Sequence, residues 1–561
     1  MGYRKWGIPA AAVALSAVLR LLYFLQIRAN PYFFAPVMDE GYHDQWAQEI
    51  AAGNWAFQLP FFRAPFYPTL LGLAYRLPGG PDFELIRGAQ LALGAFTPAM
   101  VWLIARRLVP GKPAIWAGAA FLTAADVMLA YFEADLLLEA LLAPLSALLM
   151  WFVLRAGATG AAGRWAAAGL ALGLFAVTRP NVLLFAPVLF LVALGWAGER
   201  FSLRAFRWRA GLALTLGTCL VVLPVTFVNW KWGGDPVLIA SQGGLNFFLG
   251  NNDEANGWSA TAPSLFRVDW WGGYEDAIRL AEEAEGRSLT ASEVSDHWFD
   301  RGFAWWAENP GAGMAITMKK AVFLLSGVEF GNNRDPAHFF EEFVPWGMPF
   351  LYFLYVMTPL ALLGAVVLAA RGSPGAWTLL LYLLVYSLSV ILFFVTARYR
   401  VPLRPLLAVL AVVGVHWLWV GMRTRPGRAA LALGGVAVFA VAANGNPWVR
   451  AYDPSPAQFY QSVASVYRSS GNLTEALRWQ IRTVEEDPTY PEGNLNLGTM
   501  YMETGDPAAA ITAFEAERAA DPTDAKNLAS LAQALQRVGR TEEAAARYAE
   551  AESLGLEDAP A

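Results

Sequence analysis

The sequence predicts an all-α protein in which a polytopic membrane domain of about eleven transmembrane helices precedes an α-solenoid of short helical repeats. The first observation is the composition of the 561 residues, of which 56% are hydrophobic and only 16% charged. Soluble globular domains contain about 25% charged residues, so this composition excludes that class. The second observation is a series of long apolar segments that ends near residue 445, and the third is a 34-residue periodicity beyond it.

The net charge of −5 combines two parts of opposite sign. From Pro447 to the end there are 18 acidic and 9 basic residues, so this tail carries −9 and the preceding part +4. We therefore predict two domains, a membrane domain over 1–446 and a repeat domain over 447–561. The single cysteine, Cys219, excludes an internal disulfide framework.

Eleven segments have about the 17–25 apolar residues that a helix needs to cross a bilayer. The first follows Arg4 and Lys5 as in a signal peptide. Its apolar run is too long and no small-residue cleavage site follows, so we expect an uncleaved anchor. The segments lie near residues 7–27, 84–105, 113–132, 136–154, 164–178, 180–197, 211–230, 346–370, 375–396, 401–420 and 429–445.

Lysine and arginine in the loops predict the orientation, because short cationic loops remain on the cytoplasmic side. With the N-terminus inside, one side collects Arg106, Arg107, Lys112, Arg155, Arg164, Arg200, Arg204, Arg207, Arg209, Arg371, Arg423, Arg425 and Arg428. We therefore predict a multi-pass protein of the inner (cytoplasmic) membrane. Its external, periplasmic side then carries the segments 28–83 and 231–345 and the repeat domain.

The tail repeats at an interval of 34 residues. Gly471, Gly505 and Gly539 share this spacing, and Asp487-Pro488 recurs as Asp521-Pro522. The pattern resembles the tetratricopeptide repeat (TPR), which has two helices per repeat, a glycine at the turn between them and a proline near the repeat end. We predict about three repeats that form a surface for a protein partner.

The predicted external side also carries unusual charged residues. An acidic pair, Asp39-Glu40, follows the first span. Such a pair is common at a helix N-terminus, where the helix dipole stabilises negative charge. Arginines at span ends either extend toward lipid phosphates or bind the phosphate of a ligand. The arginines in question are Arg63, Arg179, Arg398 and Arg400.

The order of these motifs resembles that in the GT-C membrane glycosyltransferases, especially the dolichyl-phosphate-mannose protein mannosyltransferases (family 39) and the bacterial aminoarabinose transferases. Those proteins show an Asp-Glu pair in the first external loop and then an Arg-Pro-Pro-x-Tyr-Pro-like motif, here Arg63-Ala-Pro-Phe-Tyr67-Pro68 with one proline replaced. A Gly-rich span ending in Thr178-Arg179-Pro180 and the run Arg398-Tyr399-Arg400-Val401-Pro402 match two further motifs. Glu139 stands where many members have a Ser-Glu or Thr-Glu pair, but here Leu138 precedes it. The resemblance covers residues 1–420.

This resemblance implies an enzyme that moves a hexose or pentose from a polyprenyl phosphate to a hydroxyl of an external protein, glycan or lipid. No nucleotide sugar is expected on that side, and the sequence has no Gly-rich loop that would bind its phosphates. The resemblance implies Asp39 as the general base, with inversion at the sugar, and Glu40 as a residue that orients the site or binds the acceptor. The leaving phosphate would bind to arginines among Arg63, Arg179, Arg398 and Arg400. An alternative for Arg63 is an ion pair with Asp39 or Glu40, and one for Arg179 is a cap at the end of a span.

Further candidates would bind the substrate. Asp135 and Glu139 are four residues apart and share a helix face, where they either bind sugar hydroxyls or pair with an arginine. Other candidates are Tyr67 in the second motif, Asn246 and Asn251 in a stretch rich in Gly, Asn and aromatic residues, and Lys319 near the membrane surface. Each also has a structural explanation, as a turn-rich loop or a lysine that extends toward lipid.

No cofactor is predicted, and no nucleic-acid partner is expected. The histidines His43, His297, His338 and His416 lack the spacing of zinc ligands. Some members of the resembled family use a divalent cation, so metal dependence stays open, and His43 lies one helical turn after Asp39. Asp126 falls inside a predicted span and is a weaker candidate for a functional carboxylate.

Two other functions compete with the transferase. A transporter or flippase of a lipid-linked glycan needs polar groups along a path at the membrane midplane. We expect no series of buried charges there, because the polar residues gather at one face. A catalytically inactive membrane anchor for the repeats would be indifferent to changes at Asp39, Arg179 and Arg398.

Overall fold

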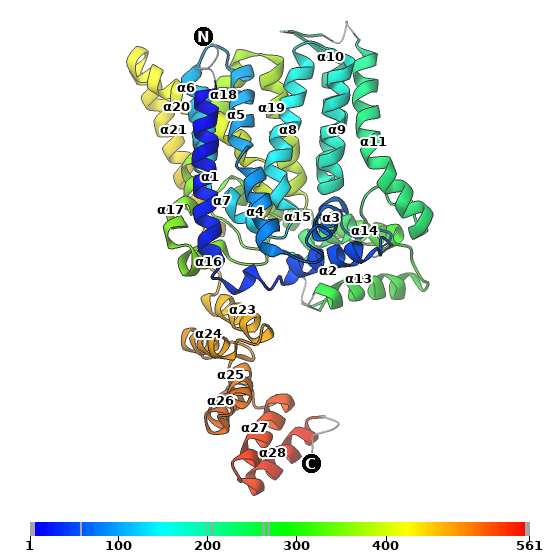
Figure 1. The fold of residues 1–561 in the computed structure, drawn as a ribbon, viewed down its shortest axis with the longest axis vertical. Helices are drawn as coiled ribbons and strands as arrows, with labels where there is room; N and C mark the ends of the chain where they lie inside the picture. The colour runs from blue at the N-terminus through cyan, green and yellow to red at the C-terminus, as the bar shows by residue number, and fades with distance from the viewer. Residues whose placement is uncertain are drawn as a thin grey trace. The chain divides into compact units, whose positions relative to one another are not determined.

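The computed structural model describes residues 6–56, 59–198, 200–202, 206–260, 264–267 and 270–555. These residues form helices almost throughout (Figure 1). The described strands are β1 (Trp196–Ala197) and β2 (Arg200–Phe201), which pair antiparallel with Trp196 opposite Phe201. The predicted class, an all-α polytopic membrane protein with a helical repeat domain, is confirmed.

The chain divides into two compact units. Met1–Ile27 and Met38–Tyr452 form the first, called the membrane unit below. Arg28–Val37 and Asp453–Ala561 form the second, called the repeat unit. The start of the first predicted external segment therefore groups with the repeats, and the rest of that segment groups with the membrane helices.

Eight helical segments among the described residues are long and apolar enough to cross a membrane. They are α1 (Gly7–Ile27), α4 (Phe83–Gly94) with α5 (Thr97–Leu108), α8 (Glu139–Gly157), α11 (Trp208–Gly233), η5 (Pro345–Gly347) with α17 (Met348–Leu351) and α18 (Phe353–Arg371), α19 (Pro374–Ile391), α20 (Arg404–Thr424) and α21 (Pro426–Asn444). A bent pair, α6 (Pro113–Ala124) and α7 (Val127–Ala134), passes the same test as one span. Two shorter apolar stretches, α9 (Ala162–Thr178) and η3 (Pro180–Phe185) with α10 (Ala186–Gly195), occupy the remaining predicted spans.

Glycines allow several of these helices to pack closely, as small residues do in membrane proteins. A Cβ on Gly364 of α18 would collide with the backbone of Leu410 in α20. A Cβ on Gly169 of α9 would collide with the backbone of Leu214 in α11. These contacts bring the backbones of neighbouring spans together and fix the positions of the helix ends that carry polar residues.

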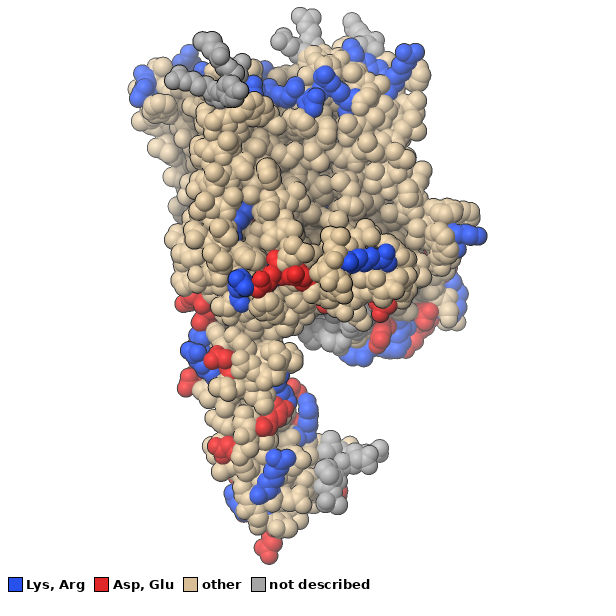
Figure 2. Space-filling view, in the orientation of Figure 1, with Lys and Arg blue, Asp and Glu red and all other residues tan. Residues whose placement is uncertain are grey.

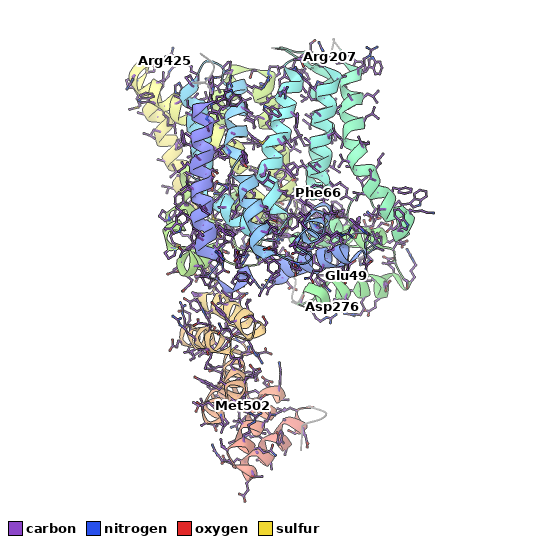
Figure 3. The ribbon with its side chains drawn as sticks, viewed as in Figure 1. Glu49, Phe66, Arg207, Asp276, Arg425 and Met502 are labelled. Carbon is purple, nitrogen blue, oxygen red and sulfur yellow. The ribbon has the colours of Figure 1, made fainter. Side chains whose placement is uncertain are left out.

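The non-spanning helices of the membrane unit connect the spans. They are α2 (Met38–Ala52), α3 (Phe66–Tyr75), α12 (Gly243–Gly250), α13 (Trp270–Glu285), α14 (Ala291–Glu308), α15 (Pro310–Leu325), α16 (Pro336–Phe343), η6 (Ala397–Arg400) and α22 (Pro447–Arg450). Figure 1 shows α2, α3, α13 and α14 at one end of the bundle of spans. Lysines and arginines gather at the opposite end (Figure 2), where Figure 3 labels Arg207 and Arg425.

The bend between α6 and α7 places Asp126 in a buried network of four charged residues. Both carboxylate oxygens of Asp126 accept from Arg404 of α20, at 2.7 Å each. Arg404 also donates to Glu329 at 2.6 Å, and Glu329 accepts from Arg400 at 2.7 Å. Two carboxylates and two guanidinium groups balance, which is the condition for keeping charge in an apolar interior.

A second buried ion pair, which the sequence analysis did not predict, joins two of the membrane helices. Arg20 of α1 donates two bonds to Glu133 of α7, at 2.6 and 2.8 Å. Gly94 of α4 faces this pair, and a Cβ at that position would overlap the Glu133 carboxylate. The sequence interpretation failed here because the two partners lie 113 residues apart.

The described part of the repeat unit contains three helix pairs and the short segment Arg28–Val37. The helices are α23 (Pro456–Ser469), α24 (Leu473–Glu486), α25 (Gly493–Thr504), α26 (Pro507–Ala520), α27 (Ala525–Arg537) and α28 (Thr541–Ser553). Gly471, Gly505 and Gly539 stand at the turn within each pair with φ of 79°, 84° and 81°, values that favour glycine. η2 (Pro31–Phe33) packs on α23, where the Tyr32 hydroxyl donates to Ser462 at 2.9 Å.

Removal of one partner from the buried network should destabilise the membrane unit strongly. We expect Asp126→Ala to lower the free energy of unfolding by about 3–5 kcal/mol, because Arg404 is left buried with an unbalanced charge. Reversible unfolding of the full chain in mixed lipid–detergent micelles measures this change. The double variant Asp126→Leu/Arg404→Met leaves the balanced pair of Glu329 and Arg400, so it should recover most of the loss. An equal loss in both variants would contradict this account.

Candidate active site

Helix α2 brings the predicted acidic pair to the end of the membrane unit opposite its cationic loops. Asp39 and Glu40 lie in its first turn, where the helix dipole favours carboxylates. Both side chains are buried, with 6% and 4% of their surface exposed. Buried carboxylates need charged partners or they take up protons, and the surrounding helix ends supply arginines.

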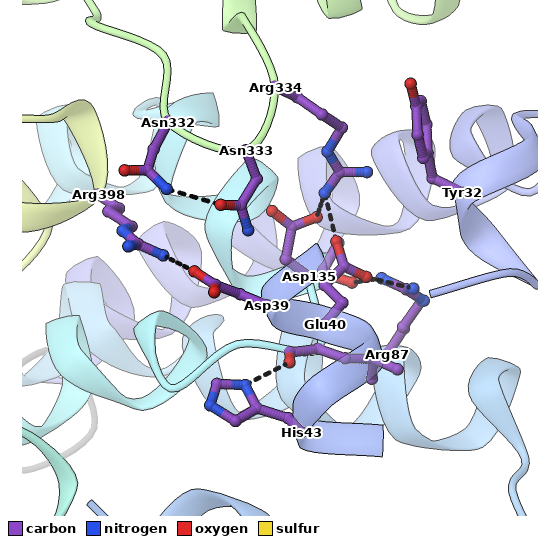
Figure 4. A network of polar contacts seen from close by, with 12 residues as sticks. Tyr32, Asp39, Glu40, His43, Arg87, Asp135, Asn332, Asn333, Arg334 and Arg398 are labelled. Atoms are coloured by element: carbon purple, nitrogen blue, oxygen red, sulfur yellow. Dashed lines mark hydrogen bonds and ion pairs between the residues drawn. The ribbon is translucent and has the colours of Figure 1, made fainter. Parts of the chain in front are cut away.

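Asp39 lies between Arg63 and Arg398, which come from distant parts of the chain; Figure 4 shows the bond to Arg398. Its Oδ1 is 2.7 Å from Nη2 of Arg63, and its Oδ2 accepts from Nη1 of Arg398 at 2.6 Å. Burial alone would raise the pKa of Asp39, but the charges of Arg63 and Arg398 outweigh it and hold the pKa well below the usual range. Asp39 is therefore ionised at every physiological pH in this arrangement.

Glu40 is bound in the same way by a second pair of arginines. Its Oε2 accepts from Nη2 of Arg87 at 3.0 Å, and its Oε1 accepts from Nη2 of Arg334 at 2.5 Å. The same Nη2 of Arg334 donates to Oδ1 of Asp135 at 2.6 Å, and Arg87 also donates to the carbonyl of Ala134. Burial raises the pKa of Asp135 to about 7, with the charge of Arg334 opposing this shift and that of Glu40 adding to it.

Glu139 connects a third arginine to the first pair. It accepts from Nη1 of Arg179 at 2.7 Å, and Nε of Arg398 lies 4.0 Å from the same oxygen. The Arg179 guanidinium lies over the ring of Tyr399, 4.0 Å from its centroid. We call the whole set the carboxylate–arginine cluster; it contains Asp39, Glu40, Asp135, Glu139, Arg63, Arg87, Arg179, Arg334 and Arg398. Five arginines face four carboxylates, so the cluster carries a positive excess that suits an anionic ligand.

A small cavity adjoins this cluster. Its wall includes Asp135 and Arg398, the loop of Gly331–Arg334 and the aromatic residues Tyr131 and Phe330. Asn332 donates to Oδ1 of Asn333 at 2.6 Å (Figure 4). Among the described residues, the buried Nδ2 of Asn333 and Nε of Arg398 have no hydrogen-bond acceptor. Buried donors of this kind are costly unless a ligand or water accepts from them.

Of the predicted site residues, the structure brings Asp39, Glu40, Arg63, Asp135, Glu139, Arg179 and Arg398 together. Tyr67 lies next to the cluster and supports it, since its buried hydroxyl donates to Gln90 at 2.8 Å. Gln90 in turn donates to the carbonyls of Glu133 and Asp135 at 2.8 and 2.9 Å. Through Gln90, Tyr67 therefore helps to hold the backbone at Glu133 and Asp135.

The other predicted residues have different surroundings. Arg400 is buried and donates to Glu329 and to the carbonyls of Ser326 and Val328. Both polar atoms of the Asn251 side chain have hydrogen-bond partners. Its amide nitrogen donates to the carbonyls of Phe247 and Leu392, and its oxygen accepts from Trp306 and Lys320. Lys319 lies over the ring of Trp258 at 5.1 Å, and Asn246 is half-buried on α12. These contacts account for Arg400, Asn251 and Lys319 without a ligand.

Two arginines of the cluster escaped the sequence analysis. Arg87 lies inside a predicted span, and an arginine at that depth is itself a signal of a functional or paired site. Arg334 follows Asn332 and Asn333 on a long external segment, and nothing in the local sequence indicates that it reaches α2. Both became recognisable once the structure placed them on Glu40.

His43 does not take part in a metal site in this arrangement. Its Nδ1 lies 3.1 Å from the carbonyl of Leu136, and its ring packs edge-on against Tyr67. Burial, with the nearby charge of Arg63, lowers the pKa of His43 to about 4, so the imidazole is neutral and donates through Nδ1. Within the described part of the chain, no group of three or more His, Cys, Asp or Glu residues could hold a metal ion.

Comparison with known proteins finds similarity to one family over part of the chain. Residues 62–228 match the family described as dolichyl-phosphate-mannose-protein mannosyltransferase. The match contains Arg63, Tyr67, Asp135, Glu139 and Arg179, and it confirms the resemblance inferred from the motifs. No curated protein matches the sequence significantly.

Two solved structures show partial similarity. The archaeal oligosaccharyltransferase AglB from Archaeoglobus fulgidus, in complex with an inhibitory peptide and a dolichol-phosphate, is similar over 89% of this chain and 60% of that chain, with 13% identity and a TM-score of 0.43. A crystal structure of MamA is similar over 25% of this chain and 86% of that chain, with 17% identity and a TM-score of 0.18.

Asp135 should titrate near neutral pH. We expect infrared difference spectra of the full chain, taken across pH 7, to show the carbonyl stretch of a protonated carboxyl group that disappears in Asp135→Asn. Because the folded pKa exceeds the usual value of about 3.9, this group also makes the folded state less stable as the pH rises from about 4 through about 7. Asp335→Asn is the control, since the pKa of Asp335 is lowered. A band that persists in Asp135→Asn would contradict the assignment.

Proposed function

We propose, from the similarity of residues 62–228 to the mannosyltransferase family, that this membrane protein transfers a sugar from a polyprenyl phosphate to an acceptor hydroxyl. The observation that carries the proposal is the position of Asp39 between Arg63 and Arg398. One carboxylate and two arginines are the groups that a displacement from a phosphate requires: a base for the acceptor and cations for the leaving group.

The donor phosphate would bind to the two arginines that Asp39 occupies. Arginine presents a planar set of donors that matches phosphate oxygens, and the positive excess of the cluster favours an added anion. As the bond to the sugar breaks, negative charge builds up on the phosphate, so these cations stabilise the transition state more than the bound substrate. Arg179, held by Glu139, is the next arginine within the cluster.

The chemical step is a single displacement. The acceptor hydroxyl oxygen forms a bond to the anomeric carbon, while the bond from that carbon to the phosphate oxygen breaks. The bonding electrons leave with the polyprenyl phosphate, and the hydroxyl proton passes to a carboxylate oxygen of Asp39. A displacement of this kind inverts the anomeric configuration.

Donor binding would also activate the base. While both arginines donate to Asp39, its pKa is so low that it accepts a proton poorly. A phosphate that takes over donors from Arg63 and Arg398 weakens this stabilisation, so the pKa of Asp39 rises toward its ordinary value. Asp39 thus becomes an effective base only when the donor is bound, so its uptake of the acceptor proton is coupled to donor binding.

The cluster is proposed to face the periplasm, or the corresponding external side, of the inner membrane. The lysines and arginines at the opposite end of the membrane unit support this orientation, because such loops remain cytoplasmic (Figure 2). An odd number of spans from a cytoplasmic N-terminus, as the eleven predicted segments give, would put the repeats on the same side of the membrane as the cluster. A protein acceptor, or a protein partner that delivers one, would suit a helical repeat surface.

Asp39→Asn should abolish transfer while leaving the fold intact. A general base contributes a factor of about 10²–10⁴ to the rate. Transfer by the purified full chain is measured with radiolabelled polyprenyl-phosphate sugars and a pool of envelope proteins. Asp44→Asn is the matched control, because Asp44 lies on the same helix and is also largely buried but bonds Tyr75 and Gln48 outside the cluster. Equal transfer by Asp39→Asn and the wild type would refute the role of the base.

Arg398→Gln should change both donor binding and pH dependence. The loss of a charge-assisted bond to phosphate should lower kcat/KM by about 10–100-fold and raise the KM for the donor. Because the charge of Arg398 lowers the pKa of Asp39, its removal should also shift the acidic limb of the pH profile to higher pH. Arg398→Lys retains the charge and should show the smaller shift. A donor KM that does not change in Arg398→Gln would exclude this arginine as a phosphate ligand.

A further inference from the structure

We propose that Tyr452 is a positioning residue that holds the loop Gly331–Asp335, and through it Arg334, against the carboxylates of the active site. The Tyr452 hydroxyl accepts from the backbone N–H of Gly331 at 2.7 Å and donates to Oδ2 of Asp335 at 2.7 Å. One hydroxyl therefore joins the two ends of a five-residue loop. The inference rests on the proposed function and adds to it a residue that neither the motifs nor the family match contains.

The Tyr452 ring is also held in place, by contacts with two aromatic side chains. It packs against Phe330 with ring centroids 4.8 Å apart and against Trp258 at 5.6 Å. The Tyr452 hydroxyl lies so close to Gly331 that a side chain at this position would not fit. A Cβ there would come within 3.1 Å of the hydroxyl and 2.9 Å of the carbonyl oxygen of Arg334. The loop is thus clamped between its own backbone and one aromatic side chain.

The clamped loop supplies functional groups to the site. Arg334 donates to Glu40 and Asp135, and Asn332 and Asn333 line the adjoining cavity. The residue before the loop, Phe330, accepts from the backbone N–H of Ala397 at 2.9 Å, directly before Arg398. A shift of Tyr452 would therefore move Arg334 relative to Glu40, whereas Arg398 keeps its own bond to Asp39.

The place of Tyr452 in the chain gives this contact a further meaning. Tyr452 is the last residue of the membrane unit, and Asp453 begins the repeat unit. A second connection between the units, Val37 to Met38, ends directly before Asp39. Met38 has a φ of 52°, which is unusual for a residue with a side chain and is typical of backbone held under strain at functional sites. One connection from the repeat unit therefore ends directly before Asp39, and another ends at Tyr452, which bonds the loop that carries Arg334.

The test is Tyr452→Phe in the full chain, which removes the hydroxyl and keeps the ring packing. Hydrogen exchange of peptides covering 328–336 reports on the loop without reference to activity, and we expect faster exchange at Gly331. In the transfer assay kcat should fall about tenfold, because the loop that carries Arg334 loses its two hydrogen bonds to Tyr452. The donor KM should change little, because Arg63 and Arg398 remain. Tyr490→Phe in the repeat unit is the matched control.

A double-mutant cycle identifies the route of the effect. If Tyr452 acts through Arg334, Tyr452→Phe should have little further effect on kcat in an Arg334→Lys background. Unchanged exchange in Tyr452→Phe, an unchanged kcat, or additive effects in the cycle would each overturn the positioning role. Absence of transfer by the wild type would instead refute the proposed function, and the exchange result would still decide whether Tyr452 holds the loop.

Discussion

The pairing of Asp39 with Arg63 and Arg398 is the interaction on which the rest of the active site depends. A buried carboxylate without partners would take up a proton and lose its charge. Two arginines keep it ionised, and those arginines must be brought in from the segment after α2 and from η6, 359 residues further along the chain. The arrangement of the spans is what makes this meeting of distant segments stable. The same logic recurs at Glu40 and Glu139, so the cluster is a set of charges that are costly to bury alone and stable only together.

This mutual dependence explains how the same side chains can form a stable set of ion pairs without a ligand and carry out the proposed chemistry when a phosphate binds. In the resting arrangement the arginines neutralise carboxylates, and a phosphate can compete for them because it offers the same kind of acceptor with more charge. When a ligand takes over the arginines, the ionised form of the carboxylates is stabilised less. Their pKa therefore rises, and they become stronger bases. The buried pairs Asp126–Arg404 and Arg20–Glu133 lack this property, because each arginine there is enclosed by protein on all sides. Under the proposed function, the position of Arg334 and Arg398 at a cavity, and not charge pairing itself, separates the cluster from these buried pairs.

The sequence was sufficient for features that repeat or that stand out locally. Apolar segments predicted the spans, the 34-residue period predicted the helix pairs, and the motifs around Asp39, Arg63, Arg179 and Arg398 predicted members of the cluster. Pairing was not predictable, because nothing in the local sequence says that Arg334 reaches Glu40 or that Arg400 turns toward Glu329. Arg398 and Arg400 stand two residues apart in one motif, yet they belong to different networks because successive side chains of η6 point in different directions. Only the packing of α2, α8 and the loop after α15 resolves that ambiguity.

The division of the chain into units also changes how the repeats should be understood. A repeat domain tethered only by its N-terminal end would bind a partner without consequence for a site elsewhere. Here the segment Arg28–Val37 leaves the membrane unit after α1, packs on α23 and returns immediately before Asp39. The segment Arg28–Val37 of the repeat unit therefore interrupts the sequence of the membrane unit, and the repeats follow that unit. A force on the repeats, such as one from a bound partner, would reach the membrane unit through Met38 and Tyr452. Met38 directly precedes Asp39, the proposed base, and Tyr452 bonds the loop that carries Arg334. Coupling of this kind needs no contact surface between the units, because the covalent chain itself carries it.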